Sequence, residues 1–529
     1  MQFFYQNRAA ARVCPKTIVI LGALGILCWV VVFHFGSESR STNPLIGSRA
    51  QELVVYCAAG IRKPVAEAAK AFEEEYGVVV RLDYGSSGEL EGKIELERAQ
   101  NAPRCDLYIP ADLSFSQRAR EKGLIAEHLT LASFQLVLAM GSDEELPTQS
   151  LSSLSSLSSL AASGIRYGIC DEKAGAGQKT CEALKAIGLW ESTQTAARAT
   201  FPRVTELAGA ILSSDVIQAG FIWDSTAHQF GLKIIPTPEM ENIQSTISAN
   251  VSAQSRNPTW ALRLARYLSA IDKGAAFFAK HHYSPANGDR WTLTPSLTFY
   301  CGGVNREAII PSIKAFEKRE GCLVETQFAG CGTLIGSIRS GPEFLPDLFM
   351  TCDASYLTMV ADDFLQPRDV SSTRVCMLVR KGNPKGIRQL SDLEQADLKI
   401  GTTDPAMSTL GALSHAMFED VGIASSLRKQ QSIIVTTPTA HELILQMEGH
   451  DKLDVALVYE ANCQHLGDNL EIIPMDHPLA RATQNMASGR TTAYPQLMER
   501  FMNTILSDQS MQSFLNHGFE WIGLNSKQP

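Results

Sequence analysis

Residues Lys70 to Leu90 read KAFEEEYGVVVRLDYGSSGEL, and this stretch decides the fold because the chain contains it twice. From Lys314 to Leu334, at a constant offset of 244 residues, the sequence is KAFEKREGCLVETQFAGCGTL. Each copy runs from the end of an amphipathic helix through a glycine into a β-branched strand and then a turn of small residues. Such an internal repeat predicts two similar units in tandem.

The repeat extends beyond this stretch on both sides. Val55-Tyr56-Cys57 precedes the first copy as Phe299-Tyr300-Cys301 precedes the second, and Asp106-Leu107 returns as Asp347-Leu348. In each copy strand-like and helix-like segments alternate, which is the pattern of an open α/β sheet whose ligands lie beyond the carboxyl ends of the strands. We therefore expect an α/β fold with one unit over residues 52–291 and a second over residues 296–523.

The composition excludes some classes of protein. The chain has 529 residues and a formal net charge of −9, so it lacks the basic surface that nucleic-acid binding requires. It contains neither the GxSxG turn of α/β-hydrolases nor the HExxH sequence of zinc proteases. We expect a protein that is not an enzyme, needs no cofactor and binds no nucleic acid.

Residues 17–35, TIVILGALGILCWVVVFHF, form an apolar run long enough for a membrane-spanning helix. Arg8, Arg12 and Lys16 precede it without an acidic residue, which by the positive-inside rule keeps residues 1–16 in the cytoplasm. We expect a single-pass cell-membrane anchor and a linker over residues 36–51, with the bulk of the chain outside the cytoplasm, in the periplasm. A cleaved signal peptide is the less favoured alternative, because no small-x-small cleavage site follows the run.

Twelve cysteines occur in the chain, and ten of them follow the apolar run. No CxxC spacing of the zinc type is present, and in an oxidising compartment some of the ten should pair. Cys301, Cys331 and Cys352 fall at predicted strand ends in the second copy. A disulfide between two of them and a soft-metal site are the two alternatives there, and we favour the disulfide. Cys170 and Cys181 are a second candidate pair.

The stretch YCAAGIRKPVAEAAKAFEEEYGVVVRLDYGSSGEL, followed by CDLYIPAD, resembles the opening of a periplasmic solute-binding protein of the molybdate-binding type. In the second copy VRKGNPKGIRQLSDLEQADLKIGTTDP, Val379 to Pro405, resembles the second lobe of the same family. The resemblance covers almost the whole chain after the linker, twice. It implies two tandem type II periplasmic-binding-protein-like units, each with two α/β lobes around a cleft that holds an oxyanion for an ABC transporter permease.

The resemblance also implies which residues face the ligand. Ser86 and Ser87 match the paired serines of the family, and Gly60 stands where the family has a first-loop serine. Trp223 stands where the family usually has a tyrosine hydroxyl, and Cys331 replaces one serine of the pair in the second copy. The full set of ligand-binding candidates is Gly60, Ser86, Ser87, Ala176, Gly177, Trp223, Cys331, Ser408, Thr409 and Tyr459.

A site of this kind needs no basic residue, because hydroxyls and backbone N–H groups at helix starts give a tetrahedral dianion several donors. The second copy has lost the serine pair and has Val304, without a side-chain donor, at the position that matches Gly60. We therefore expect at most one high-affinity site per chain for molybdate or tungstate. The alternatives are a binder of ferric or other metal ions, for which an adjacent tyrosine pair is missing, and a degenerate tandem sensor or scaffold that binds weakly.

Overall fold

The computed structural model describes residues 52–141, 157, 160, 164–213, 216–449 and 452–523. The expected cytoplasmic tail (1–16), membrane anchor (17–35) and linker (36–51) lie outside the described residues. Within the described part of the chain, no helix is both long and apolar enough to cross a membrane.

The first unit is built on one ten-stranded mixed sheet. Its strands are β1 (Glu52–Ala58), β2 (Val79–Gly85), β3 (Leu107–Ile109), β4 (Ile125–Met140), β5 (Tyr167–Cys170), β6 (Ala199–Phe201), β7 (Ala219–Trp223), β8 (Lys233–Ile235), β9 (Gln244–Ser252) and β10 (Ser284–Pro285). They follow the order β2-β1-β3-β9-β4-β7-β5-β6, with β8 and β10 also paired to β4. The helices around this sheet are α2 (Arg62–Tyr76), α3 (Ser87–Ala99), α4 (Leu113–Glu121), α6 (Gly175–Ala186), α7 (Trp190–Ala196), α8 (Val204–Ser213), α9 (Asp224–Gln229), α10 (Pro258–Ser269) and α11 (Gly274–Lys280).

The second unit repeats this arrangement. Its strands are β11 (Ser296–Gly302), β12 (Leu323–Ala329), β13 (Leu348–Met350), β14 (Arg368–Arg380), β15 (Ile400–Thr403), β16 (Ile433–Thr437), β17 (Val455–Tyr459), β18 (Leu470–Pro474), β19 (Arg481–Ser488) and β20 (Glu520–Trp521). The order β12-β11-β13-β19-β14-β17-β15-β16 matches the first sheet strand for strand. The helices are α12 (Arg306–Glu320), α13 (Cys331–Ser340), α14 (Ala354–Thr358), α15 (Thr409–Val421), α16 (Ala424–Gln430), α17 (Ala440–Gly449), α18 (Pro495–Ile505) and α19 (Asp508–Asn516).

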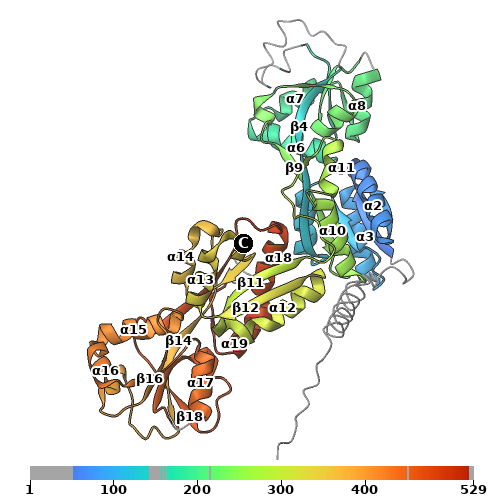
Figure 1. The fold of residues 1–529 in the computed structure, drawn as a ribbon. Coiled ribbons are helices and arrows are strands. Elements are labelled where there is room, and N and C mark those ends of the chain that lie inside the picture. Colours follow the sequence, from blue (N-terminus) through green and yellow to red (C-terminus); the bar gives the residue numbers. More distant parts are fainter. Residues whose placement is uncertain are drawn as a thin grey trace, which may run out of the picture.

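One long strand runs through both lobes of each unit (Figure 1). The first part of β4 is antiparallel to β9, and its last five residues, from Leu136, pair with β7 of the other lobe. In the second unit β14 does the same with β19 and then, from Val375, with β17. Each unit therefore consists of two α/β lobes joined through a continuous strand, as the family resemblance implied.

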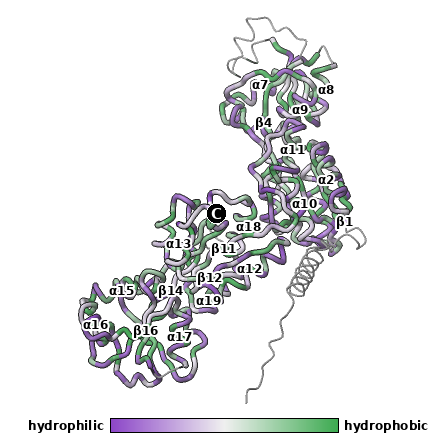
Figure 2. The backbone as a smooth tube through the Cα atoms, in the orientation of Figure 1, coloured by the Kyte–Doolittle hydropathy of each residue, from purple (hydrophilic) through white to green (hydrophobic). Residues whose placement is uncertain are grey.

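The duplicated stretch has the same local structure in both copies. Gly77 and Gly321 end α2 and α12 in the left-handed conformation, each with φ of 67°, which costs glycine no steric strain. Phe72 and Phe316 are buried on the inner faces of these helices. Hydrophobic and hydrophilic stretches alternate throughout both units (Figure 2), as sheets covered by helices require.

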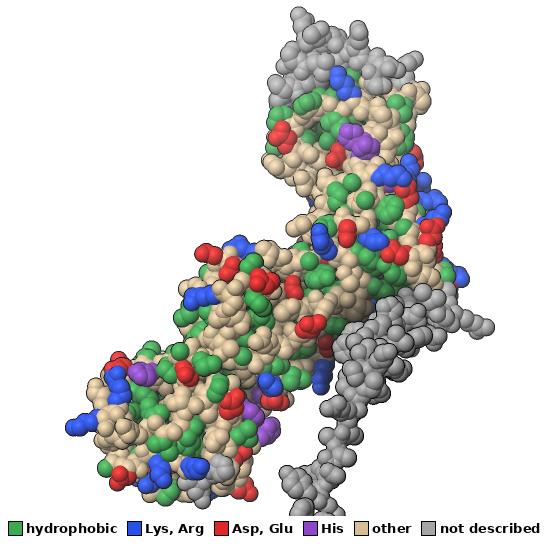
Figure 3. Space-filling model, in the orientation of Figure 1, with side chains coloured by type: hydrophobic (Ala, Val, Ile, Leu, Met, Phe, Trp, Pro, Cys, Tyr) green, Lys and Arg blue, Asp and Glu red, His purple; other side chains and the backbone are tan. Residues whose placement is uncertain are grey.

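The two units contact each other through helix packing, an ion pair and hydrogen bonds. α10 of the first unit packs against α12 of the second. The guanidinium of Arg319 forms an ion pair with Glu127 at 2.6 Å. Asp289, near the end of the first unit, accepts the N–H of Gln496 at 2.7 Å at the start of α18. On the face seen in Figure 3, acidic and basic side chains are interspersed over both units.

Candidate ligand-binding clefts

The first cleft begins where β2 turns into α3. Ser86 takes an extended conformation as the N-cap of the helix, and its Oγ accepts the N–H of Glu89 at 3.3 Å. The Glu89 carboxylate accepts the N–H of Ser86 at 2.9 Å, which completes a capping box. Hydrogen bonds from the backbone and side chain of Ser86 lower the pKa of Glu89. Ser86 therefore caps α3, a role that its position in the turn before the helix allows.

Ser87 is the better placed of the two serines. Its side chain is buried, and its Oγ accepts the N–H of Ala111, beyond the end of β3, at 3.2 Å. Its backbone carbonyl accepts the hydroxyl of Tyr108 at 2.8 Å. Among the described residues nothing accepts the O–H of Ser87, so this hydroxyl has a proton to donate to a ligand.

The start of α6 supplies the second group of donors. Ala174 is its N-cap and has no side chain that can cap the helix, so the first-turn N–H groups at Ala176 and Gly177 have no partner within the helix. Both residues are buried. A Cβ atom at Gly177 would lie 2.1 Å from the carbonyl oxygen of Asp171, so the close turn from β5 into α6 requires glycine here.

Asp112 links the starts of α3 and α6 across the cleft. It follows Ala111, the residue bonded to Ser87, and its Oδ2 accepts the hydroxyl of Ser245 at 2.6 Å. The Nζ of Lys179, on α6, lies 3.9 Å from the same Asp112 oxygen. Ser87 and α6 are thus linked through Ala111, Asp112 and the side chain of Lys179. Lys179 is a basic residue at this site that the sequence analysis did not identify.

Trp223 and Gly60 contribute less than a hydroxyl at their positions would. The Trp223 ring is buried and lies edge-on to Phe134, with the ring centroids 4.4 Å apart. The carbonyl of Gly60 accepts the hydroxyl of Tyr283 at 3.0 Å, and no atom lies within 4 Å of a Cβ built at Gly60. Trp223 therefore packs against β4, the strand that runs through both lobes. Gly60 leaves open space near the start of α2.

An arginine occupies the same position in both copies and was also missed. The guanidinium of Arg62 lies over the ring of Tyr84, 4.8 Å from its centroid, and that of Arg306 lies over Phe328 at 4.7 Å. Both pairs keep the repeat offset of 244 residues, and this recurrence could have identified the arginine from the sequence. Arg306 lines the cavity of the second cleft. Each unit thus has an arginine at the start of its first long helix.

The second cleft is closed where the first has its serine turn. The N–H of Gly332, in the first turn of α13, donates to the carbonyl of Met407 in the other lobe at 3.0 Å. A Cβ at Gly330 would lie 2.3 Å from the same Met407 oxygen. The serine found at the matching position of the first copy cannot fit here. Glycine at 330 follows from the contact between the lobes.

A cavity of about 190 Å³ remains in the second cleft, and Ser408 and Tyr459 line it together with Val304. The hydroxyls of Thr409 and Tyr459 and the Oδ1 of Asn462 are buried without a hydrogen-bond partner of normal geometry in the described structure. Burial raises the pKa of the Tyr459 phenol well above its ordinary value, so it stays protonated as a donor. The predicted residues Ser408, Thr409 and Tyr459 therefore come together.

The expected disulfides are not formed. All ten described cysteines are free thiols, including Cys301, Cys331 and Cys352, so the predicted pairing is wrong for this structure. Cys331 instead takes the structural role of Ser87, because its Sγ accepts the N–H of Cys352 at 3.0 Å. Cys181, expected to pair with Cys170, donates to a carboxylate oxygen of Glu172 at 3.4 Å.

The cysteines of the second copy also lack the arrangement of a metal site. Within the described residues, no group of three or more histidine, cysteine, aspartate or glutamate side chains could hold a metal ion. Burial raises the pKa of Cys331, but hydrogen bonds from the thiol and the N–H of Cys352 outweigh it and lower the pKa overall. The same thiol contact, with burial, raises the pKa of Cys352 well above its ordinary value.

Comparison with known proteins agrees with the two-unit architecture. The chain matches the sequence profile of the family described as bacterial extracellular solute-binding protein over residues 53–284 and again over 297–520. A Haemophilus influenzae protein named "Putative binding protein" is 24% identical over 241 residues, which cover 45% of this chain and 93% of that protein.

Two solved structures are similar at low identity. The periplasmic molybdate-binding protein of Azotobacter vinelandii is 18% identical with a TM-score of 0.36, covering 44% of this chain and 100% of that chain. Iron-bound HitA from Pseudomonas aeruginosa is 16% identical with a TM-score of 0.37, covering 46% of this chain and 89% of that chain. Because the two profile matches together cover most of its residues, this chain belongs to the bacterial extracellular solute-binding protein family, as a tandem duplicate.

Proposed function

We propose that this chain is an extracytoplasmic solute-binding protein that holds a small tetrahedral oxyanion, molybdate or tungstate, in the cleft of its first unit. The observation that carries the proposal is the buried Ser87. Its O–H has no acceptor among the described residues, and through Ala111 and Asp112 it lies in one region with the uncapped start of α6. A hydroxyl and several backbone N–H groups suit a dianion that must be held without a full counter-charge.

The second cleft is proposed to bind an oxyanion much more weakly or to serve as a scaffold. The N–H of Gly332 at the start of α13 already donates to the carbonyl of Met407. The thiol of Cys331 is also a weaker donor than the serine hydroxyl at the matching position of the first copy. A ferric-ion binder is less favoured, since the described residues contain no cluster of three metal-ligating side chains of the histidine, cysteine or carboxylate kind.

Titration calorimetry on the full chain tests this proposal. Molybdate and tungstate should bind with a stoichiometry of one per chain, and sulfate, phosphate and ferric iron should bind more weakly. Two equivalent molybdate sites per chain would contradict the assignment of different roles to the two clefts. Binding of ferric iron alone would favour the metal-ion alternative.

We further propose that residues 17–35 anchor the chain in the cell membrane and that the bound anion passes to an ABC-type permease. The apolar run and the basic residues before it support the anchor. Protease treatment of intact spheroplasts tests the topology. Residues 52–523 should be digested from outside, while a tag placed before residue 1 should be protected.

A further inference from the structure

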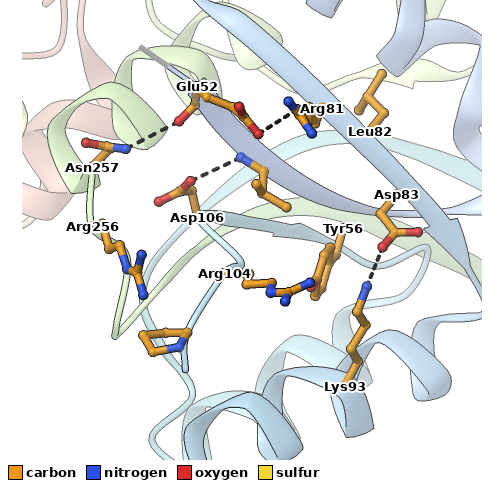
Figure 4. A pocket seen from close by; sticks show the side chains of 12 residues that line it. Glu52, Tyr56, Arg81, Leu82, Asp83, Lys93, Arg104, Asp106, Arg256 and Asn257 are labelled. Carbon is orange, nitrogen blue, oxygen red and sulfur yellow. Dashed lines mark hydrogen bonds and ion pairs between the residues drawn. The ribbon is translucent and has the colours of Figure 1, made fainter. Parts of the chain in front are cut away.

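A pocket of about 630 Å³ lies in the first lobe of the first unit, away from the cleft (Figure 4). It is lined by the amino-terminal half of β1 and by residues of β2, together with the loops before β3 and α10. The cleft residues follow the carboxyl ends of the same strands. The pocket is therefore a separate site from the one proposed above, and the inference drawn from it does not depend on that function.

Most charges around this pocket are already paired. Glu52 forms an ion pair with Arg81 at 2.6 Å, and Asp83 forms one with Lys93. Asp106 accepts two neutral donors, the N–H of Val54 at 3.0 Å and the hydroxyl of Ser255 at 2.6 Å. Of the four cations that line the pocket, two are therefore not paired with these acids.

Arg104 and Arg256 are those cations. Both side chains are exposed, and neither guanidinium has an ion pair or hydrogen bond to any described residue. Figure 4 shows both among the lining side chains, without a dashed line to either. They come from segments about 150 residues apart that the fold brings to one pocket.

The second copy shows that the aspartate does not need these arginines. Asp347 matches Asp106 and makes the same two contacts, to the N–H of Thr298 at 2.9 Å and to the hydroxyl of Thr492 at 2.6 Å. The position of Arg104 is Leu345 in the second copy, and that of Arg256 is Ala493. The carboxylate is thus a structural feature of both copies, and the two arginines are an addition in the first.

The other two lining cations are also confined to the first copy. Arg81 is matched by Glu325, and Lys93 by Ser337. In the second copy this edge is contacted by the end of the first unit, since the N–H of Arg290 donates to the carbonyl of Ala493 at 2.8 Å. At the matched positions of the described residues, these four lining cations are present in the first copy and absent from the second.

We propose that this pocket binds a phosphate-bearing group through the guanidinium groups of Arg104 and Arg256. Guanidinium presents several N–H donors in a planar fork that matches phosphate oxygens, and the lining acids are occupied by other partners. Glu52, the first described residue, lines the pocket. If residues 17–35 anchor the chain, the stretch 36–51 reaches at most about 55 Å, so an anionic lipid headgroup is one source of the phosphate and free phosphate is the other.

Hydrogen exchange on the full chain in lipid nanodiscs tests this proposal and separates the two sources. In one arm the discs contain only phosphatidylcholine and inorganic phosphate is titrated. In the other arm phosphatidylglycerol replaces part of the lipid and no phosphate is added. Peptides containing Arg104 and Arg256 should gain protection in at least one arm, and more at low salt because exposed charges are screened.

The test variant combines Arg104→Leu and Arg256→Ala, which introduces the residues present in the second copy. This variant should require about tenfold more phosphate for half-maximal protection of these peptides, or it should lose the protection given by phosphatidylglycerol. The control combines Arg198→Ala and Arg388→Ala, two exposed arginines outside the pocket, and should behave as wild type. Arg256→Ala alone serves if the double variant melts early.

Protection by inorganic phosphate identifies a free anion as the ligand, and protection only by phosphatidylglycerol identifies a lipid headgroup. The proposal is overturned if neither arm protects these peptides, or if the test variant is protected as well as wild type. Because exchange is read locally, a failure of oxyanion binding in the cleft leaves this result unaffected.

Discussion

The backbone N–H of Gly332 donates to the carbonyl oxygen of Met407 at 3.0 Å, and this bond joins the two lobes of the second unit. In a cleft that closes on an anion, an N–H at a helix start would face the ligand. In the second unit the acceptor is instead the carbonyl of Met407 in the other lobe. The second unit is therefore closed by its own backbone at the point where the first unit presents serines.

Gly332→Ala should destabilise the second unit, because the new Cβ would lie 2.2 Å from the carbonyl oxygen of Ala406. We expect a loss of about 1–3 kcal/mol in the free energy of unfolding, as for other substitutions that overfill a packed contact. Denaturant unfolding of the full chain measures it. Gly336→Ala is the matched control on the same helix, where no atom lies within 4 Å, and it should be neutral or stabilising by up to about 1 kcal/mol.

Ser87→Ala should weaken molybdate binding in the first cleft by about 1–3 kcal/mol, the usual effect of removing a donor to a charged group. The same change also removes the acceptor for the N–H of Ala111, so a loss of affinity alone does not separate the two roles. Calorimetry and thermal unfolding should be measured together. Unchanged affinity for molybdate would show that Ser87 does not bind the anion.

Ser87→Cys separates these roles. Cys331 shows that a thiol at this position accepts the equivalent N–H, at 3.0 Å from Cys352, so stability should be close to that of wild type. The affinity for molybdate should still fall, because S–H is a weak donor. Equal losses of stability in the alanine and cysteine variants would indicate that the thiol cannot replace the structural contact.

Cys301, Cys331 and Cys352 should be recovered as free thiols. Alkylation of the denatured chain without reductant, followed by peptide mapping, should modify all three, because each is a free thiol in the folded chain. All three are buried, so alkylation before denaturation should be slow. A linked pair of peptides from this group would show that oxidation occurs, and Cys331 with Cys352 is the pair to expect, because the Sγ of Cys331 already accepts the N–H of Cys352 at 3.0 Å.

Much of the fold could be predicted because the repeat carries its own local signals. The glycines that stop α2 and α12 and the buried phenylalanines of these helices recur at a fixed offset, so the order of the helices and strands could be predicted from local sequence. The grouping of Ser408, Thr409 and Tyr459 was also predicted, since each lies at the end of a strand or the start of a helix in the second lobe.

The parts that sequence did not predict depend on contacts between distant segments. Nothing near Gly332 in the chain indicates that Met407 will take its N–H, and the cysteines face partners that spacing alone cannot identify. Ser86 was predicted as a ligand-binding residue, and the structure shows it capping α3 through Glu89, a role that a serine three residues before a glutamate allows. Lys179 was missed because Asp112, which its Nζ approaches at 3.9 Å, lies far from it in the sequence and in the other lobe.

The buried ion pair of Arg500 and Glu320 joins helices α18 and α12 beside the contact between the units. The Nε of Arg500 lies 2.7 Å from Oε1 of Glu320, and both side chains are almost fully buried. Glu320→Gln leaves the arginine charge without its counter-charge, so unfolding should require about 3–5 kcal/mol less. Glu419→Gln breaks the exposed pair with Arg428, at 2.9 Å, and should cost at most about 1 kcal/mol. Denaturant unfolding of both variants decides between the two outcomes, because equal small losses would mean that water or another acid, such as Asp289, compensates Arg500 in the variant.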